Sequence, residues 1–451
     1  MRYTIDRAGP PRSATHSVQP TVAVTHDPVP AAADPPPEPQ IHMLTPSTSN
    51  DEIRMAERYQ IADLYSFAMF TFTDAVAAAR DIAARVLQPS AAERDKTAQF
   101  STEAVRAMGD AGLLGLLVPA DAGGQGLGPR TFADVTAILA EADASVAMVY
   151  VMHVMGAAVI AAAPPTDRLR KILSDIAAGR HLSTLAFSEA GSRSHFWAPV
   201  SRAIGRNGSG VLVSARKSFV TSAGHADSYV VSTLAPSGSG PTDSTLYLVP
   251  ASTAGLAVAG AWDGMGLRAN ASAPMTLDSC AIAPDLQLTP DGAGFKAMLE
   301  VVLPLFNLAS AAVALGLCRA TVNATTGHLK TARFEHLDAT IGEALPTLRA
   351  QLAGMQIATD SLAALIDDGV ARLESPDERT MLRVLELKAA AGETAITVTS
   401  TAMRTCGGAA FSRQTGVDRF FRDAHAGAIM APTADVLREF IGKALLGIPL
   451  F

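Results

Sequence analysis

Three histidines are the side chains in this sequence best suited to move a proton. His195 precedes an aromatic pair, His225 follows a glycine, and His425 follows an Arg-Asp-Ala triplet. An imidazole titrates near neutral pH, so it can shuttle a proton or donate a hydrogen bond to a reacting oxygen. Each could instead be a packing or surface histidine, and this alternative is strongest for His225. His195 and His425 are therefore the candidate catalytic residues.

Composition and charge disfavour other kinds of chemistry. The 451 residues carry a formal net charge of −7, whereas a nucleic-acid-binding surface needs a basic stripe. Cys280, Cys318 and Cys406 lie far apart and form no Cys-x-x-Cys pair, so no disulfide framework or metal site can be recognised. We expect a cytoplasmic protein that binds neither nucleic acid nor metal, because free thiols fit a reducing compartment.

The first 50 residues differ from the rest of the chain. They contain 10 of the 27 prolines and little amphipathic pattern, so they cannot bury enough apolar surface to offset their chain entropy. We expect residues 1–50 to be a disordered tail; a start codon assigned too far upstream is the alternative. The tail has no apolar stretch of the kind that a signal peptide needs.

One segment is apolar enough to cross a membrane. Residues 144–163 contain no Asp, Glu, Lys or Arg, over about the 20 positions that a bilayer requires. The segment is rich in alanine, has His153 in its middle and ends at Pro164-Pro165. A helix that is buried on all sides has the same pattern, and we expect a buried helix and no membrane span.

The hydrophobic pattern divides the chain into helical, strand and helical parts. Apolar residues recur at helical spacing in the first and last parts, and short strands bounded by turn residues lie between them. We expect an α+β fold with a helical domain over 51–181, a β-domain over 182–292 and a helical bundle over 293–451. The expected helices are 56–87, 102–114, 168–178, 295–324, 345–366, 378–405 and 436–446, and the expected strands are 210–214, 228–232 and 245–249.

Five short motifs follow one another over most of the chain. They are Pro119–Gly126, Ser188–His195, Lys217–Ala223, Gly264–Arg268, and Gly407-Gly408 with Arg422–Ala424. In order and separation they resemble the motifs of the acyl-CoA dehydrogenase superfamily, whose members are flavoproteins with this α–β–α order. The resemblance extends from about Thr97 to Leu446.

This resemblance implies a fold and a cofactor. The implied fold has an N-terminal helical domain, a middle β-domain and a C-terminal four-helix bundle, and the implied cofactor is FAD, with FMN as the alternative. The flavin needs hydroxyl donors, a flat lid and close backbone approach. The implied flavin-binding residues are Ser188 and Thr221 at the ring, Phe219 as its lid, Ser194 at the phosphates, Gly407 and Gly408 at the dinucleotide, Thr433 near the cofactor, and Arg333 towards the flavin of a neighbouring subunit.

Several of these residues also have ordinary interpretations. Ser188 and Thr221, taken singly, could be strand hydroxyls, and Arg333 could be a surface arginine. Arg193 stands where the superfamily motif has a glycine. It could pair with a phosphate or a substrate carboxylate, or form a surface ion pair.

The positions where superfamily dehydrogenases carry their catalytic base hold other residues here. The glutamate that removes the α-proton of an acyl thioester commonly follows the Arg-Asp-Ala triplet, and Ala431 occupies that position. The other known location, on the helix that opens the last domain, corresponds to Phe306-Asn307. Proton removal needs a base within hydrogen-bond reach, so the resemblance is incomplete at the reaction centre.

Three functions are compatible with this departure. The favoured one is a monooxygenase, similar to the superfamily's oxygenase branch, which takes reduced flavin from a separate reductase and uses O2 on a small hydrophobic substrate. The alternatives are a dehydrogenase of CoA or carrier-protein thioesters with a relocated base, and a non-catalytic relative. We also expect a homo-oligomer, a tetramer or a dimer, because the helices over 295–324 and 378–405 carry more apolar surface than one subunit readily covers.

Overall fold

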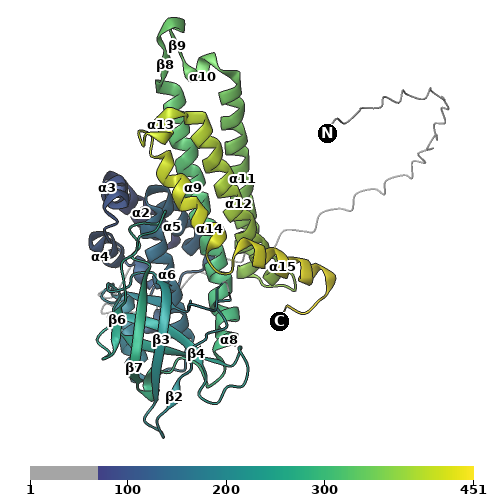
Figure 1. Ribbon diagram of the computed structural model, residues 1–451. Helices are drawn as coiled ribbons and strands as arrows, with labels where there is room; N and C mark the ends of the chain where they lie inside the picture. Colours follow the sequence, from purple (N-terminus) through teal and green to yellow (C-terminus); the bar gives the residue numbers. More distant parts are fainter. Residues whose placement is uncertain (1–69, 194, 451) are drawn as a thin grey trace, which may run out of the picture. The chain divides into compact units, whose positions relative to one another are not determined.

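The structure is a computed structural model that describes residues 70–193 and 195–450 (Figure 1). The expected tail over 1–50 and the start of the first expected helix lie outside these residues. The first described part of the chain is helical, as the periodicity predicts. Its α-helices are α2 (Phe72–Ile82), α3 (Ala91–Thr97), α4 (Thr102–Asp110), α5 (Pro129–Ala142), α6 (Ala144–Ala162) and α7 (Asp167–Ala177).

The apolar helix α6 belongs to the core. Asp143 caps its N-terminus by accepting hydrogen bonds from the amides of Ser145 and Val146 at 3.0 and 3.2 Å, and also forms an ion pair with Arg94. Most residues of α6 are buried within the molecule. In the described part of the chain, the other helix that is long and apolar enough to span a membrane, Gly294–Thr331, is also mostly buried. Burial in the core therefore accounts for the hydropathy of both helices.

His153, in the middle of α6, joins three segments. Its side chain is fully buried, and its Nδ1 accepts a hydrogen bond from the amide of Ser183 at 3.0 Å. Nε2 therefore carries the ring hydrogen and donates it to the carbonyl oxygen of Leu114, 3.0 Å away. Burial lowers the pKa of His153 to about 4. The neutral ring thus ties α6 to the turn at 113–115 and to the first strand.

The middle of the chain forms two small sheets. One has the order β1-β4-β5, with β1 parallel to β4, and the other has the antiparallel order β2-β3-β7-β6. β4 and β5 are buried along nearly their whole length, whereas β3 alternates between buried and exposed residues, as a strand covered on one face does. The strands are β1 (Ser183–Ala186), β2 (Ile204–Gly205), β3 (Val211–Val220), β4 (Ser228–Leu234), β5 (Ser244–Pro250), β6 (Leu256–Val258) and β7 (Ala273–Ile282).

Helix returns after the β-domain, as expected over 295–324, and it contains one π-helical turn. A π-helical turn, η7 (Met298–Val302), separates α8 (Gly294–Ala297) from α9 (Leu303–Thr331). Pro304 is the second residue of α9 and follows the π-helical turn directly, and its ring nitrogen has no hydrogen to donate to that turn. The remaining elements are the hairpin β8 (Arg333–Phe334) and β9 (Ala339–Thr340), then α10 (Ile341–Ala344), α11 (Pro346–Glu374), α12 (Thr380–Cys406), α13 (Gly408–Phe411), α14 (Val417–Ile429) and α15 (Ala434–Leu446).

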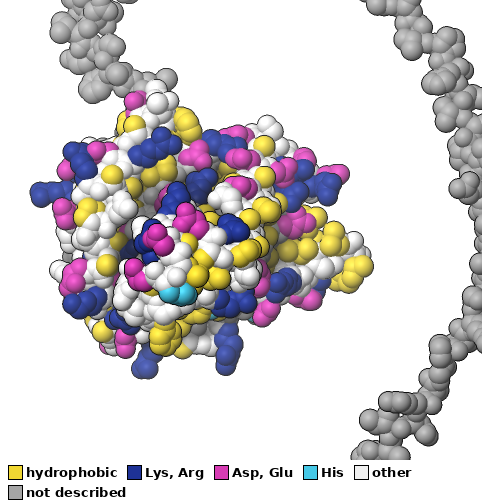
Figure 2. All heavy atoms as spheres, turned by 90° about the horizontal axis from the view of Figure 1, so that it is seen from above, with side chains coloured by type: hydrophobic (Ala, Val, Ile, Leu, Met, Phe, Trp, Pro, Cys, Tyr) yellow, Lys and Arg dark blue, Asp and Glu magenta, His cyan; other side chains and the backbone are white. Residues whose placement is uncertain are grey.

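The helix α9 is central to the helical part, where it contacts α5, α11, α12 and α14 (Figure 1). It approaches α5 closely at Gly316, where a Cβ would lie 2.4 Å from the carbonyl oxygen of Ala137. Most of α9 is buried within the single chain, which corrects the expectation that this helix leaves apolar surface for a second subunit. Exposed apolar side chains gather instead at the projecting end of α15 (Figure 2), namely Leu445, Leu446 and Ile448.

Candidate functional site

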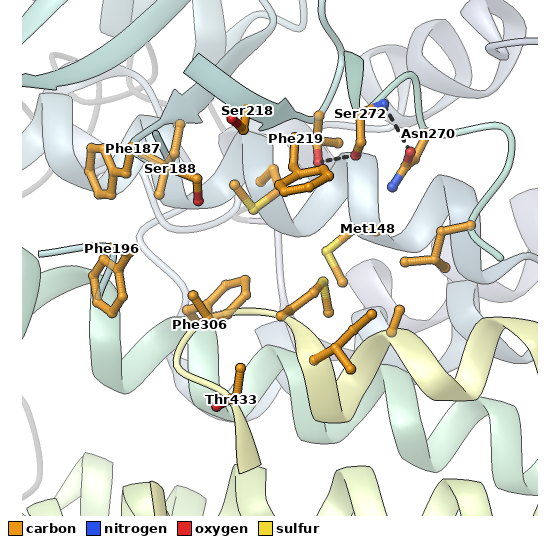
Figure 3. A pocket seen from close by; sticks show the side chains of 18 of the residues that line it. Met148, Phe187, Ser188, Phe196, Ser218, Phe219, Asn270, Ser272, Phe306 and Thr433 are labelled. Atoms are coloured by element: carbon orange, nitrogen blue, oxygen red, sulfur yellow. Dashed lines mark hydrogen bonds between the residues drawn. The ribbon is translucent and has the colours of Figure 1, made fainter. Parts of the chain in front are cut away.

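A cavity of about 700 Å³ lies where the β-domain faces the helices. One side is formed by the segments that follow β1 and β3 and that precede β7. The other side is formed by α6, the start of α9, α14 and the segment leading into α15. Figure 3 shows Ser188 and Phe219 on the first side, across the cavity from Phe306 and Thr433 on the second. The volume is that of a pocket for a small-molecule ligand.

The wall from the β-domain carries hydroxyl and amide groups beside its aromatic side chains. Thr221 follows β3, and Ser272 and Asn270 precede β7, so the pairing of β3 with β7 brings the three together. The hydroxyl oxygens of Thr221 and Ser272 are 3.0 Å apart, and the amide of Ser272 donates to Oδ1 of Asn270 at 3.1 Å (Figure 3). Ser188 lines the same wall, and its carbonyl accepts from the amide of Ser218 at 2.8 Å. The wall therefore presents a row of hydroxyl and amide groups.

The wall from the helices is mostly apolar, and its polar residues are Arg422, His425 and Thr433. Met148 and Met152 line it from α6, Phe306 from the start of α9, and Met430 from the segment after α14. Thioether and aromatic side chains make favourable contacts with aromatic rings. A flat molecule with a polar edge and an apolar face therefore fits between the two walls.

Phe219 presents an open aromatic ring to the cavity. The residue is 69% exposed, and its ring lies edge-to-face against Trp262 with centroids 6.3 Å apart. Its backbone has a φ of 57°, and Ser222, Leu267 and Ala271, in the same or neighbouring segments, also have positive φ values of 62°, 48° and 50°. Residues other than glycine adopt this conformation at a cost, and such positions gather at ligand-binding sites.

A buried ion pair fixes the polar wall. Lys217, in β3, donates to the Glu189 carboxylate and to the carbonyl oxygen of Ser232, the latter at 2.6 Å. The carboxylate also accepts from the amides of Val200 and Ser201 at 2.9 and 2.7 Å. Burial would raise the pKa of Glu189, but the charge of Lys217 and the hydrogen bonds from Ser201 hold it below its usual value. Glu189 is thus an ionised group whose two oxygens are already bound.

His425 lines the cavity from α14. Its Nδ1 lies 2.7 Å from the carbonyl oxygen of Phe421, and because a carbonyl can only accept, Nδ1 carries the hydrogen. The lone pair of the neutral ring is then on Nε2, which makes no hydrogen bond to a described residue. His425 can therefore take a proton at Nε2 and return it.

The two charged residues before His425 hold α14 in place. Arg422 donates to both carboxylate oxygens of Asp95, at 2.9 and 2.6 Å. Asp423 accepts from the amide of Leu267 at 2.6 Å, and burial raises the pKa of Asp423 to about 7. Gly266 permits this close contact, since a Cβ there would lie 2.4 Å from the carbonyl oxygen of Arg422. The Arg-Asp pair thus positions the helix that carries the histidine.

A second buried lysine holds the segment after α14. Nζ of Lys388, in α12, donates to the carbonyl oxygens of Met430 and Pro432 at 2.8 and 2.6 Å, with that of Gly427 at 3.4 Å. No carboxylate of the described chain pairs with it, and burial lowers the pKa of Lys388 to about 7. The residue between the two closer carbonyls is Ala431, which lines the cavity.

The structure brings part of the expected flavin site together. Five of the expected flavin-binding and catalytic residues line this one cavity, and so do Arg193, Phe306 and Ala431. The five are Ser188, Phe219, Thr221, His425 and Thr433. The hydroxyl of Thr433 also caps α15 by accepting from the amide of Val436 at 3.4 Å.

The other expected site residues lie elsewhere. His195 is exposed and stacks on Trp197, with ring centroids 4.9 Å apart, and it does not line the cavity. Arg333, in the hairpin β8–β9, hydrogen-bonds Asp338 at 2.8 Å, and Gly407 and Gly408 lie at the end of α12. Within one chain Arg333, Gly407 and Gly408 do not line the cavity, and their flavin contacts stay predictions. Ser194 lies outside the described residues.

Some residues of the site were not found from the sequence. Asn270 and Ser272 follow the Gly264–Arg268 motif directly, so two polar residues ahead of a strand were the available signal. Lys388 has a weaker signal, as a lone cation among the apolar positions of α12. Among residues 70–193 and 195–450, no three His, Cys, Asp or Glu side chains gather to hold a metal ion.

Comparison with known proteins accounts for the whole described fold. Models of the acyl-CoA dehydrogenase N-terminal, middle and C-terminal domains match residues 73–180, 184–280 and 292–446. Cyclohex-1-ene-1-carbonyl-CoA dehydrogenase of Geobacter metallireducens is 26% identical over 373 residues, which are 81% of this chain and 96% of that protein. The order of the three domains confirms the expected fold class.

Two solved structures share the architecture. PigA with FAD and proline superposes with a TM-score of 0.77 and 18% identity, over 84% of this chain and 97% of PigA. FMN-bound TdsC from Paenibacillus sp. A11-2 superposes with a TM-score of 0.75 and 23% identity, over 83% of this chain and 98% of TdsC. At these identities the likeness establishes the fold alone.

Proposed function

Since the chain belongs to the acyl-CoA dehydrogenase family, we propose that it is a flavin-dependent oxidoreductase whose cavity holds the flavin ring and a small substrate. The reaction proposed is a monooxygenation that uses reduced flavin and O2 on a small hydrophobic substrate. A separate reductase would supply the reduced flavin. FAD is the proposed cofactor and FMN the alternative, since PigA was solved with FAD and TdsC with FMN.

The residues around the cavity fit a flavin ring. Thr221, Ser272 and Asn270 offer hydroxyl and amide groups to a polar edge, and the exposed ring of Phe219 offers a flat surface. A bound flavin supplies electron transfer and, when reduced, reaction with O2. Beside a bound ring, the methionines and Phe306 of the opposite wall would limit the access of water and so suppress side reactions with solvent.

The observation that carries the proposal is the state of the one carboxylate on the described cavity wall. Glu189 is ionised, and Lys217, Val200 and Ser201 occupy its oxygens. A carboxylate bound in this way cannot approach the α-carbon of a thioester. Oxygen transfer needs no carboxylate base, so the bound state of Glu189 favours it.

His425 is the proposed catalytic residue. Its Nδ1–H is held by the Phe421 carbonyl, which sets the ring so that Nε2 can exchange a proton within the cavity. Protonated at Nε2, it would donate a hydrogen bond to oxygen that develops negative charge, and it would recover the proton from the substrate or solvent.

The test separates oxygenase from dehydrogenase chemistry. Protein loaded with oxidised FAD is mixed anaerobically with butyryl-CoA, and protein loaded with photoreduced FAD is mixed with O2. We expect no loss of flavin absorbance in the first mixture, and in the second a release of H2O2 slower than from free reduced flavin. Bleaching of the flavin by the thioester would overturn the proposal.

A His425→Ala variant tests the role of the imidazole. We expect faster release of H2O2 from the variant than from the wild type, with the affinity for reduced flavin within about twofold, because a proton donor acts after the flavin is bound. Equal H2O2 release in the two proteins would remove His425 from the mechanism.

One observation favours a second candidate, dehydrogenation of an acyl thioester. The free lone pair on Nε2 of His425 makes it a possible base in place of the missing glutamate. Dehydrogenases are also among the relatives, as the Geobacter protein shows. If butyryl-CoA bleaches the flavin in the wild type but not in His425→Ala, this candidate replaces the first.

The proposed assembly is a homo-oligomer. Leu445, Leu446 and Ile448 at the end of α15 are exposed, as is Phe411 of α13, and apolar side chains of this size are commonly covered by a second subunit. Light scattering at micromolar concentration would give a mass of two or four chains, and a monomeric mass would contradict the assembly.

A further inference from the structure

The charges that line the cavity do not balance. Arg193, Arg422, Glu189 and His425 are the ionisable side chains on the described wall. Glu189 is neutralised by Lys217 and Arg422 by Asp95. Within residues 70–193 and 195–450 the guanidinium of Arg193 forms no ion pair with a carboxylate. The cavity thus has one fixed positive charge that the described protein leaves uncompensated.

Arg193 also holds a backbone conformation that glycine would adopt without cost. Its φ is 49°, in the left-handed region that side chains with a Cβ disfavour. Two residues before it, Gly191 has a φ of 103°, so the same turn has a glycine at its other position with positive φ. An arginine at a strained position on a cavity wall indicates a function for the side chain, because packing does not require it: Arg193 is exposed.

We propose that Arg193 binds an oxyanion of the molecule that occupies the cavity, a phosphate or a carboxylate. The planar guanidinium presents paired N–H groups that match two oxygens of such a group. The apolar wall opposite, with Met148 and Phe306, takes the uncharged part of the same ligand. The inference rests on the proposed function only in taking the cavity as the ligand site.

The oxyanion has two possible sources, the phosphate of the flavin and an acidic group of the substrate. Riboflavin and FMN share one ring system and differ by one phosphate, so they report on the first source. Hexanoate and 1-hexanol share one alkyl chain and differ by the carboxylate, so they report on the second. Calorimetric titration measures all four against the full-length protein and needs no turnover.

Two variants are used. Arg193→Gly removes the charge and relieves the backbone strain, and Arg193→Lys keeps the charge but lacks the paired N–H groups of the guanidinium. We expect Arg193→Gly to lose at least about tenfold in affinity for FMN or for hexanoate, as the loss of a charge-assisted hydrogen bond implies. Its affinity for riboflavin and 1-hexanol should stay within about twofold of wild type. The affinity of Arg193→Lys for FMN or hexanoate should lie between those of the wild type and Arg193→Gly.

Thermal unfolding excludes a folding defect as the cause. Glycine adopts a positive φ freely, so the Tm of Arg193→Gly should equal or exceed that of the wild type. Equal affinities of the wild type and Arg193→Gly for both FMN and hexanoate would overturn the inference. Failure of the wild type to bind riboflavin, with the hexanoate effect intact, would instead overturn the proposed function.

Discussion

Each wall of the cavity is held by a buried lysine, but the two lysines are neutralised differently. Lys217 fixes the polar wall through a carboxylate, Glu189, whereas Lys388 fixes the segment from Met430 to Pro432 through backbone carbonyls alone. Burial lowers the pKa of both lysines, and only Lys217 has a counter-charge, Glu189, that opposes this lowering. The polar wall is therefore anchored by a full ion pair, and the apolar wall by carbonyl dipoles alone.

The largest effect is expected when the ion pair is broken on one side. Glu189→Gln leaves the Lys217 ammonium buried without a counter-charge, and we expect a loss of about 3–5 kcal/mol in the free energy of unfolding, measured with urea. The double variant Glu189→Leu/Lys217→Met removes both charges and should lose less. A Glu189→Gln variant as stable as the wild type would show that the pair does not anchor the wall.

A smaller effect with a distinct pH dependence is expected at Lys388. Lys388→Met leaves two well-formed carbonyl contacts unmade, so the variant should lose about 1–3 kcal/mol near pH 7. In the wild type the folded pKa is about 7 and the usual value is 10.5. Between these values the unfolded chain holds a proton that the folded chain has released, so stability rises with pH.

The stability of the wild type relative to Lys388→Met should therefore increase from pH 7 towards pH 10. The slope is at most about 1.4 kcal/mol per pH unit. Urea unfolding of both proteins at pH 7 and 9 measures it. A difference that does not change with pH would show that the carbonyls keep Lys388 protonated, which would make the two anchors alike.

The smallest effect concerns the contact between the walls and the ligand. Thr221→Val keeps the shape of the side chain and removes the hydroxyl that faces Ser272, so flavin affinity should fall by about 0.5–1.5 kcal/mol. Met148→Leu, a volume-conserving change on the opposite wall, serves as the control and should leave the affinity nearly unchanged. Fluorescence titration with FAD compares them. Equal losses in the two variants would contradict the division into a polar and an apolar wall.

Much of the fold could be predicted from the sequence because it follows from local patterns. The helices α6, α7, α12 and α15 lie within one to two residues of the expected bounds, since caps and apolar periodicity determine them. The helix expected over 102–114 ends early, at Asp110, because Gly112 takes a φ of 73°. The pairing of β1 with β4 joins distant strands, and a local pattern does not reveal such a partner.

The site was only partly predictable for a similar reason. Thr221 and Ser188 stand in recognisable motifs, so their common wall was expected. Lys388 acts through the carbonyls of a segment about 40 residues away, and neither its burial nor its partners can be deduced from composition. Whether Gly407 lies near a flavin depends on a second chain, which a single sequence does not place.

The neutral ring of His153 sets a lower limit on the pH at which this protein can be handled. Its folded pKa is about 4, against a usual 6.5, so between these values only the unfolded chain takes up the proton and stability falls as the pH is lowered. A protonated ring could no longer accept the hydrogen bond from Ser183, so the junction between α6 and β1 would weaken first. Elution or storage near pH 4 would therefore favour separation of the helical and sheet parts, whereas preparation above about pH 6.5 would preserve them.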